Sequence, residues 1–275
     1  MLILAATPIG NLSDASPRLV EHLVGSHYIA AEDTRTLFKL AQALGVKINA
    51  KTYSLHDHNE RERLEQLVEV AREHDLLVVS DAGMPTVSDP GFNLVRACAE
   101  AGVDVTIVPG PSAVLSALAV SGLPTDRFTF EGFMPRKDGE RRTLFEELLR
   151  ERRTMIFFES PHRLFDSLQV AAEVFGADRK ASVSRELTKK FEHTERGTLA
   201  QLADWAKSDP KGEFVVVIAG AGELIRDIHT LVEDVLALVE SGERLKDAVN
   251  QIAELSKVSK GELYQLSLDA RKDKQ

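Results

Sequence analysis

The segment 77–91, LVVSDAGMPTVSDPG, contains the residues whose types and spacing most clearly suggest chemistry. Its apolar start predicts a buried strand that ends at Asp81 and continues into a loop of small residues. Gly83 and Gly91 permit close approach of a ligand to the backbone, and two prolines stiffen the loop. Ligands bind at the carboxyl ends of strands in open parallel sheets. We therefore predict a ligand-binding loop here.

Two further segments, 7–11 (TPIGN) and 107–114 (IVPGPSAV), also follow apolar runs, and Ser112 is the predicted N-cap of the next helix. The carboxylate and the backbone carbonyls of such loops suit a cation or a hydrogen-bond donor. S-adenosylmethionine has a sulfonium, an ammonium group and ribose hydroxyls, and therefore fits. The alternative is that these are capped turns without a ligand, but three such loops on one sheet favour a site.

The sequence contains no Walker A motif for a triphosphate. The segment 220–225, GAGELI, has two glycines of a dinucleotide fingerprint, but Ile225 stands where a third small residue belongs. In 56–60, HDHNE, His56 and His58 could form a metal pair, but no third ligand stands in register. A polar loop before a helix is the favoured interpretation, and we expect no metal.

Two charged segments of the second half of the chain also follow predicted strands. In FFESPHR (157–163), Glu159 ends a strand and a helix bearing His162 begins at the proline. SRELTKKFEHTE (184–195) combines Arg185, Glu186 and Lys189 at a strand end or hairpin. Taken alone, that charge run is typical of a solvated edge.

The hydrophobic pattern predicts the elements that position these residues. Strands are expected at 2–6, 28–32, 51–55, 76–80, 103–108, 127–131, 154–159, 180–185, 191–196 and 214–219. Helices are expected at 17–24, 34–44, 60–74, 91–101, 112–120, 141–151, 161–175, 198–207, 227–240 and 244–270. Ser16-Pro17 and Asp89-Pro90 each match an N-cap followed by a first-turn proline, and Thr198 is a third N-cap.

The alternation predicts an α/β protein of two α/β domains and a helical extension. Residues 1–122 form an N-terminal domain with a mostly parallel sheet covered on both faces. Residues 123–222 form a domain with a mixed sheet, because 180–196 leaves no room for a crossover helix. Residues 223–275 form a helical extension that resembles a helix-turn-helix, with a simple helical cap as the alternative.

Composition sets outer limits on the function. The 275 residues are 43% hydrophobic and 28% charged, as in an ordinary soluble globular protein. No apolar run is long enough for a membrane span, and the single Cys98 excludes disulfides, so we expect a cytoplasmic protein. The net charge of -9 argues against a general nucleic-acid-binding surface but permits a local basic patch.

The motifs TPIGN, AEDTR (31–35), SDAGMPTVSDPG, PGPSA, SGLPTDRF, FFESPHR and RELTKKFE occur in an order that resembles the tetrapyrrole-methylase superfamily. Its members are S-adenosylmethionine-dependent enzymes. RELTK and FFESPHR resemble the branch that methylates a cytidine ribose 2'-hydroxyl in small-subunit ribosomal RNA. The resemblance implies two α/β domains with the cofactor in the cleft between them, and a homodimer whose partner is that RNA or the assembled small subunit.

The resemblance also implies the cofactor-binding residues, and the charged residues at strand ends suggest the catalytic and RNA-contacting ones. The cofactor would lie against Pro8, Gly10, Asp81, Ala82, Gly83, Ser88, Ser112, Ala113, Phe158, Glu159, Ala219 and Gly220. The candidate catalytic residues are Glu186, Lys189, His162 and Arg185, with Glu186 as general base and Lys189 beside the developing oxyanion. RNA phosphates would be met by Arg35, Arg136, Lys137, Arg141 and Arg142.

Two other functions remain open on the sequence alone. The first is a methyltransferase that acts on a precorrin-type tetrapyrrole in the same cleft. The second is a non-catalytic RNA-binding protein, in which 244–270 reads RNA and the α/β body is a scaffold. RELTK and the helical extension favour the ribosomal RNA enzyme over the first.

Overall fold

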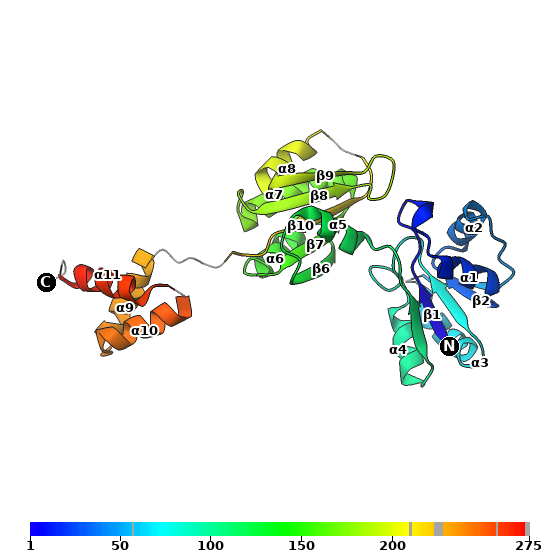
Figure 1. Ribbon diagram of the computed structural model, residues 1–275, viewed down its shortest axis with the longest axis horizontal. Helices are drawn as coiled ribbons and strands as arrows, with labels where there is room; N and C mark the ends of the chain where they lie inside the picture. Colours follow the sequence, from blue (N-terminus) through cyan, green and yellow to red (C-terminus); the bar gives the residue numbers. More distant parts are fainter. Residues whose placement is uncertain (57, 209–210, 223–227, 257, 273–275) are drawn as a thin grey trace. The chain divides into compact units, whose positions relative to one another are not determined.

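The computed structural model describes residues 1–56, 58–208, 211–222, 228–256 and 258–272. The chain forms two compact units, residues 1–219 and 220–275. The first unit contains two five-stranded sheets and the second is helical (Figure 1). The predicted α/β class, with two sheets followed by helices, is confirmed.

The first sheet has the strand order β3-β2-β4-β1-β5, and every neighbouring pair is parallel. The strands are β1 (Leu2–Ala5), β2 (Tyr28–Ala31), β3 (Lys51–Ser54), β4 (Leu76–Val79) and β5 (Val105–Val108). The helices that follow β1 to β4 are α1 (Pro17–Gly25), α2 (Thr34–Ala43), α3 (Glu60–Glu73) and α4 (Phe92–Glu100). Because all five strands are parallel, their carboxyl ends share one edge.

Both faces of this sheet are buried, because successive strand residues point to opposite sides. Ile3 packs with Leu19 and Leu37 of α1 and α2. Leu2 belongs to the opposite core, with Leu67 and Leu94 of α3 and α4. The sequence-based prediction of a parallel sheet covered on both faces is therefore confirmed.

The second sheet has the order β6-β7-β10-β8-β9. Its strands are β6 (Phe128–Phe133), β7 (Thr154–Glu159), β8 (Lys180–Arg185), β9 (His193–Thr198) and β10 (Phe214–Ile218). Only β6 and β7 are parallel, whereas the other pairs are antiparallel, as predicted for a mixed sheet. One face carries α6 (Asp138–Glu147), α7 (Leu164–Phe175) and α8 (Leu199–Ala206).

The opposite face of the second sheet is covered by α5 (Ala113–Ser121), the helix that follows β5. Val114 and Leu118 of α5 pack against Ile156 of β7 and Val217 of β10. A division of the chain at 122–123 therefore separates α5 from the sheet on which it packs. The residue bounds of the three predicted domains stay a prediction.

The predicted helix starts agree with the structure at three N-caps and fail at a fourth. The side chains of Ser16, Ser112 and Thr198 each accept a hydrogen bond from a first-turn N–H. At α4 the prediction of an Asp89 cap is wrong: Gly91 is the N-cap, with φ of 119°, and it provides no side-chain cap. The first N–H groups of α4 are capped from elsewhere in the chain.

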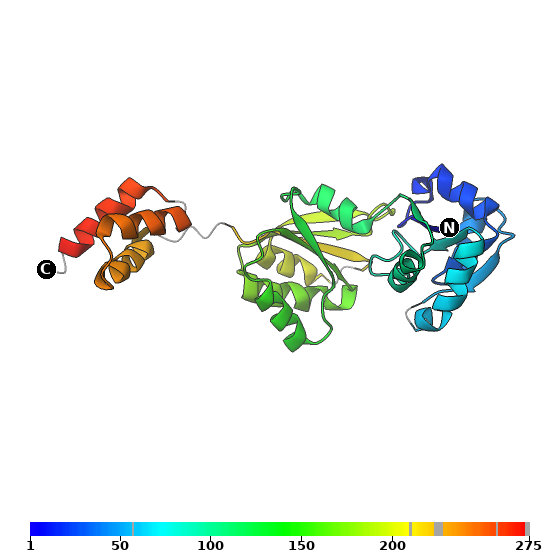
Figure 2. The ribbon, with the colours of Figure 1, turned by 90° about the horizontal axis from the view of Figure 1, so that it is seen from below.

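The second unit contains α9 (Ile228–Glu240), α10 (Leu245–Ser256) and α11 (Lys260–Lys272), which Figure 2 shows side by side. Leu231, Val235, Ala248 and Leu263 form a core of its own. The predicted helical character is confirmed in the described residues, where α10 and α11 pack against each other. No helix in the described part of the chain combines the length and apolar character needed to cross a bilayer.

Candidate cofactor-binding and active site

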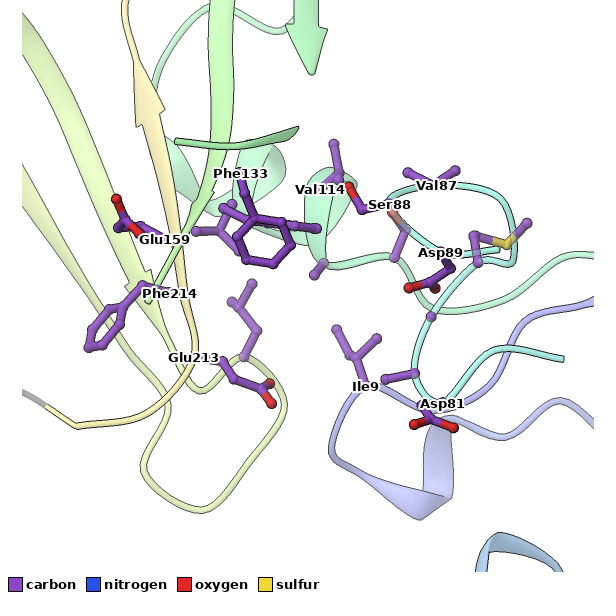
Figure 3. Close-up of a pocket in the computed structure, with 18 of the residues that line it drawn as sticks. Ile9, Asp81, Val87, Ser88, Asp89, Val114, Phe133, Glu159, Glu213 and Phe214 are labelled. Atoms are coloured by element: carbon purple, nitrogen blue, oxygen red, sulfur yellow. The ribbon is translucent and has the colours of Figure 1, made fainter. Parts of the chain in front are cut away.

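A cavity of about 430 Å³ lies between the carboxyl-end loops of the first sheet and the second sheet (Figure 3). Its size is typical of a small-molecule site. It is lined by Ile9, Glu32, Asp81, Ala82, Gly83, Met84, Val87, Ser88, Asp89, Ser112, Ala113, Val114, Phe133, Phe158, Glu159, Ser160, Pro161, Leu187, Gly212, Glu213, Phe214 and Val215. The lining thus combines all three loops singled out in the sequence with the ends of β6, β7 and β10.

Two of these loops are joined by hydrogen bonds between their backbones. The Thr7 N–H donates to the Gly83 carbonyl at 2.9 Å, and the Gly83 N–H donates to the Thr7 carbonyl at 3.1 Å. The Thr7 hydroxyl also donates to the Ser80 carbonyl at 3.3 Å. Gly83 has φ of 82°, a conformation that glycine adopts without a steric penalty. The loops after β1 and β4 therefore form one wall.

The remainder of the loop after β4 is strained. Thr86 and Ser88 have φ of 76° and 62°, in the left-handed region that residues with a Cβ avoid. Each such residue costs about 1–2 kcal/mol. Strained conformations persist only where the surrounding structure holds them. The backbone of this wall is therefore held in place by contacts beyond the loop itself.

The carboxylates at the ends of β2 and β4 form a network. The Asp33 N–H donates to Asp81 Oδ1, and the Asp81 N–H donates to Glu32 Oε2, each at 3.2 Å. Arg35 Nη2 lies 2.6 Å from Asp33 Oδ2, and hydrogen bonds from Arg35 lower the pKa of Asp33 to about 2. Partial burial, followed by the charge of Asp33, raises the pKa of Asp81. Asp81 is thus an acid in an environment that disfavours uncompensated negative charge.

The facing wall consists of aromatic and apolar groups. The Phe133 and Phe158 rings meet edge to face at 5.3 Å, and Phe133 is exposed and points into the cavity (Figure 3). The carboxylate of Glu159 points away, because Arg163 Nη2 lies 2.7 Å from it and Ser160 N–H and Ser167 hydroxyl also donate to it. Glu159 therefore fixes the turn after β7.

A second charged network lies at the rim of the cavity, beside the lining residues Leu187 and Glu213. Lys189 Nζ lies 3.0 Å from Glu186 Oε1 and 2.9 Å from Glu213 Oε2, and Glu186 Oε1 also accepts the Glu213 N–H. That backbone hydrogen bond, then the one from Lys189, lowers the pKa of Glu186. Burial opposes the charge of Lys189, but its hydrogen bonds to Glu213 and Glu186 raise its pKa.

Two glycines make room for this rim network. A Cβ at Gly10 would lie 2.4 Å from Lys189 Cγ, and a Cβ at Gly212 would lie 2.6 Å from Glu186 Cγ. Gly10 belongs to the loop after β1, whereas Lys189 follows β8. The lysine stem therefore crosses from the second sheet to the loop of the first sheet, which requires a residue without a side chain at position 10.

The structure brings most of the predicted cofactor residues together. Eight of them line the cavity, namely Asp81, Ala82, Gly83, Ser88, Ser112, Ala113, Phe158 and Glu159. Pro8 and Gly10 lie on either side of Ile9, which lines it. The lining therefore agrees with the predicted residues except for those expected near β10.

Ala219 and Gly220 require a correction. The lining instead contains Gly212, Glu213, Phe214 and Val215, at the start of β10. Phe214 pairs with Glu159 at the cavity, and Ile218 pairs with Met155 at the opposite end of β7. Because β10 runs antiparallel to β7, its carboxyl end points away from the site. Ala219 and Gly220 were expected from the family resemblance, whereas Gly212 and Glu213, which precede the valine run of β10, are the residues that line the cavity.

The predicted catalytic residues lie in different surroundings. Glu186 and Lys189 form the rim network. His162 is exposed on the short 3-10 helix Pro161–Arg163, directly after a lining residue. Arg185 ends β8, and its Nε is buried without a hydrogen-bond partner in the described part of the chain.

The predicted RNA-contacting residues divide into two groups. Arg35 is exposed in α2, beside the Asp81 network. Arg136 and Lys137 are exposed shortly after Phe133, and Arg142 pairs with Glu173 at 2.6 Å. Arg141 is wrong as a phosphate contact, because it is only 4% exposed and donates to Asp138 and the Pro135 carbonyl. Through these two hydrogen bonds Arg141 fixes the segment that leads into α6.

The chemistry of the lining fits a cation better than an anion. Glu32, Asp81, Asp89, Glu159 and Glu213 contribute carboxylates, of which Glu159 pairs with Arg163 and Glu213 with Lys189. The described lining residues include no lysine or arginine. A triphosphate would be repelled by such a surface. The residues therefore fit S-adenosylmethionine, whose sulfonium and ammonium groups favour carboxylates and whose adenine suits aromatic and apolar contacts. No cluster of three metal-ligating side chains occurs among the described residues.

The family model described as "Tetrapyrrole (Corrin/Porphyrin) Methylases" matches residues 1–203. The chain belongs to this family. It is 47% identical over 274 residues to ribosomal RNA small subunit methyltransferase I of Mycobacterium tuberculosis (strain CDC 1551 / Oshkosh), covering 99% of this chain and 96% of the relative. The protein of that name from Escherichia coli O157:H7 is 42% identical, with 98% and 94% covered. The resemblance inferred from the motifs is confirmed.

Solved structures of tetrapyrrole methylases share the fold of this chain. The methyltransferase CobJ has a TM-score of 0.56 at 21% identity, covering 80% of this chain and 94% of that one. A uroporphyrin-III C-methyltransferase from Thermus thermophilus, complexed with S-adenyl homocysteine, has a TM-score of 0.53 at 16% identity, covering 78% and 95%. At these identities the likeness establishes the fold.

We predict that Gly10→Ala lowers the free energy of unfolding by about 1–3 kcal/mol, because the new Cβ overlaps the Lys189 stem. Urea unfolding measures the change. Gly25→Ala is the matched control, since nothing lies within 4 Å of its Cβ and a change within about 0.5 kcal/mol is expected. Equal stability of Gly10→Ala and wild type would show that Lys189 does not rest on Gly10.

Proposed function

We propose that this tetrapyrrole methylase transfers a methyl group from S-adenosylmethionine to a cytidine ribose 2'-hydroxyl in small-subunit ribosomal RNA. The observation that carries the proposal is the acid-lined cavity at the strand ends, which contains no cationic side chain among its described lining residues. The near full-length similarity to ribosomal RNA small subunit methyltransferase I supports the choice of substrate. That similarity also favours RNA over a tetrapyrrole.

The lining residues bind and orient the cofactor. S-adenosylmethionine supplies an electrophilic methyl group when it is bound. Asp81 and Asp89 offer carboxylates to its cationic end, and Ser88 and Ser112 offer hydroxyls. Phe133 and Phe158 offer ring surface to the adenine. Holding donor and acceptor in line supplies up to about 7–11 kcal/mol of the rate enhancement.

The rim network acts on the ribose hydroxyl. Lys189 carries a positive charge and stabilises the negative charge that develops on the 2'-oxygen while its proton passes to solvent water. Glu186 is a poorer base than the sequence suggested, because its lowered pKa and its two donors favour the ionised, paired state. We therefore assign Glu186 to holding Lys189 in place. His162 and Arg185 remain the other candidates for contact with the reacting nucleotide.

RNA is held by exposed basic residues on both sides of the cavity. Arg35 is exposed beside the first sheet, and Arg136 and Lys137 are exposed just before α6. Arg142 of α6 is half-buried and would have to leave Glu173 to contact RNA. These local charges work against a net charge of -9, so RNA binding should weaken steeply with salt. The enzyme works in the cytoplasm as a homodimer, on the RNA or on the assembled small subunit, as the family resemblance implies.

Labelled S-adenosylmethionine should transfer its label to small subunits isolated from cells that lack this modification. Naked small-subunit RNA and a precorrin-type tetrapyrrole are tested in parallel. Label in RNA at a 2'-O-methylcytidine, mapped by nuclease digestion and mass spectrometry, is the expected result. Label in the tetrapyrrole alone would establish the other enzyme, and binding of RNA without uptake of cofactor would establish a non-catalytic protein.

We predict that Lys189→Met lowers the single-turnover methylation rate by at least about tenfold, because the alkoxide loses its cation. Glu186→Gln keeps Lys189 charged but removes one of its two carboxylate partners, so a smaller loss is expected. Lys211→Met removes an exposed lysine near the same segment and serves as control. If both substitutions in the rim left the rate within about twofold of wild type, the rim network would have no role in the reaction.

We predict that affinity for S-adenosylmethionine falls in acid through the titration of Asp81. The pKa of Asp81 is raised above its ordinary 3.8, so protonation of this carboxylate begins at a higher pH than for an exposed aspartate. Calorimetry from about pH 4 to about pH 8 should show binding that weakens as the pH falls. Asp81→Asn should bind weakly and with a flatter pH dependence, whereas Asp104→Asn, at the opposite strand ends, should follow wild type. An unchanged profile in Asp81→Asn would remove Asp81 from cofactor binding.

A further inference from the structure

The last residue of the HDHNE segment, Glu60, is a buried carboxylate whose role the sequence did not reveal. Glu60 is only 4% exposed although it is the first residue of α3. Its Oε1 accepts the Gly91 N–H at 3.1 Å and the Leu94 N–H at 3.2 Å, and its Oε2 accepts Asn93 Nδ2 at 2.9 Å. All three donors belong to the start of α4, 31 to 34 residues further along the chain.

These hydrogen bonds replace the cap that α4 lacks. Gly91 is the N-cap of α4 and has no side chain, and the first turn of α4 contains no acidic residue. The Glu60 carboxylate satisfies two N–H groups that would otherwise have no partner within the helix. It also places a negative charge at the positive end of the helix dipole. A residue of α3 thus fixes where α4 begins.

The start of α4 is also the end of the strained loop that lines the cavity. This loop contributes Asp81, Ser88 and Asp89 to the lining. Its first part is held by the hydrogen bonds between Thr7 and Gly83. Gly91, with φ of 119°, closes its second part and is bonded to Glu60. The strained residues Thr86 and Ser88 therefore lie between two attachments, of which Glu60 provides the second.

We propose that Glu60 is a positioning residue for cofactor binding, which holds the loop 84–91 in its binding conformation through the start of α4. The proposal rests on the function proposed above, since the ligand of this loop is taken to be S-adenosylmethionine. Glu60 does not line the cavity and acts only through Gly91, Asn93 and Leu94. Without its carboxylate the strained loop relaxes, and the cofactor has to restore the conformation on binding.

Glu60→Gln tests the proposal, because it keeps the size of the side chain but turns one acceptor oxygen into a donor. The expected result is a rise of about tenfold in the Kd for S-adenosylmethionine, measured by calorimetry well below the unfolding temperature. The KM for the cofactor should rise by a similar factor while kcat at saturating cofactor stays within about twofold. Glu62→Gln, an exposed glutamate in the same first turn, is the matched control and should bind as wild type does.

Asn93→Ala provides a second variant, in case Glu60→Gln does not fold. It removes one of the three donors, so a rise of about threefold in Kd is expected. Amide hydrogen exchange without cofactor should also show faster exchange at Gly91 and Leu94 in Glu60→Gln. A purely structural Glu60 would lower the unfolding temperature and leave the Kd unchanged.

The outcomes separate this inference from the function on which it rests. If wild type binds no S-adenosylmethionine, the proposed function fails. If wild type binds it and both variants bind it with the same Kd, Glu60 does not position the loop and the inference is overturned. If the variants bind more weakly and Glu62→Gln does not, the inference stands whichever RNA or tetrapyrrole accepts the methyl group.

Discussion

The pair of hydrogen bonds between Thr7 and Gly83 is the interaction on which the site depends. Loops after parallel strands have no ladder to hold them together, because each leaves the sheet independently. The exchange of N–H and carbonyl groups between these two residues joins the loops after β1 and β4 into one surface. Gly83 makes this possible by adopting a positive φ. Asp81 lies two residues before Gly83, so its hydrogen bonds with Asp33 and Glu32 adjoin that junction.

The negative charge of the cavity depends on which of the carboxylates in and beside it are neutralised by a neighbouring cation or hydrogen-bond donor. Glu159 has a cation and two further donors, so its charge is balanced within the protein and serves to fix a turn. Asp33 is balanced by Arg35. Asp81 accepts a backbone N–H and lies close to Asp33, with a raised pKa as the consequence. An incompletely compensated carboxylate stabilises a nearby cation by more than a paired one, so Asp81 suits the site to a positively charged ligand.

Much of the fold could be predicted from the sequence because its determinants are local. The strands and helices follow apolar periodicity, and the caps at Ser16, Ser112 and Thr198 each involve residues within one turn. The cavity could be located because parallel strands share a carboxyl edge. Sequence reasoning failed where direction or distant contacts decide the outcome. The position of Ala219 and Gly220 away from the cavity follows from the direction of β10. Arg141 is buried beside Asp138, and the start of α4 is capped by Glu60, which is distant in sequence.

The rim network shows why the two sheets are needed in one site. The Lys189 stem lies against Gly10 of the first wall, while its ammonium group is held by Glu186 and Glu213 of the second. A lysine in this position is ordered at both ends, so in the proposed reaction little further side-chain entropy would be lost at this residue. The same contact makes the position of the ammonium group depend on the loop after β1, and that loop is bonded to the loop after β4. The backbone hydrogen bonds between the two loops thereby link the cavity wall to the Lys189 ammonium group, and in the proposed reaction this link would favour the alignment of three atoms.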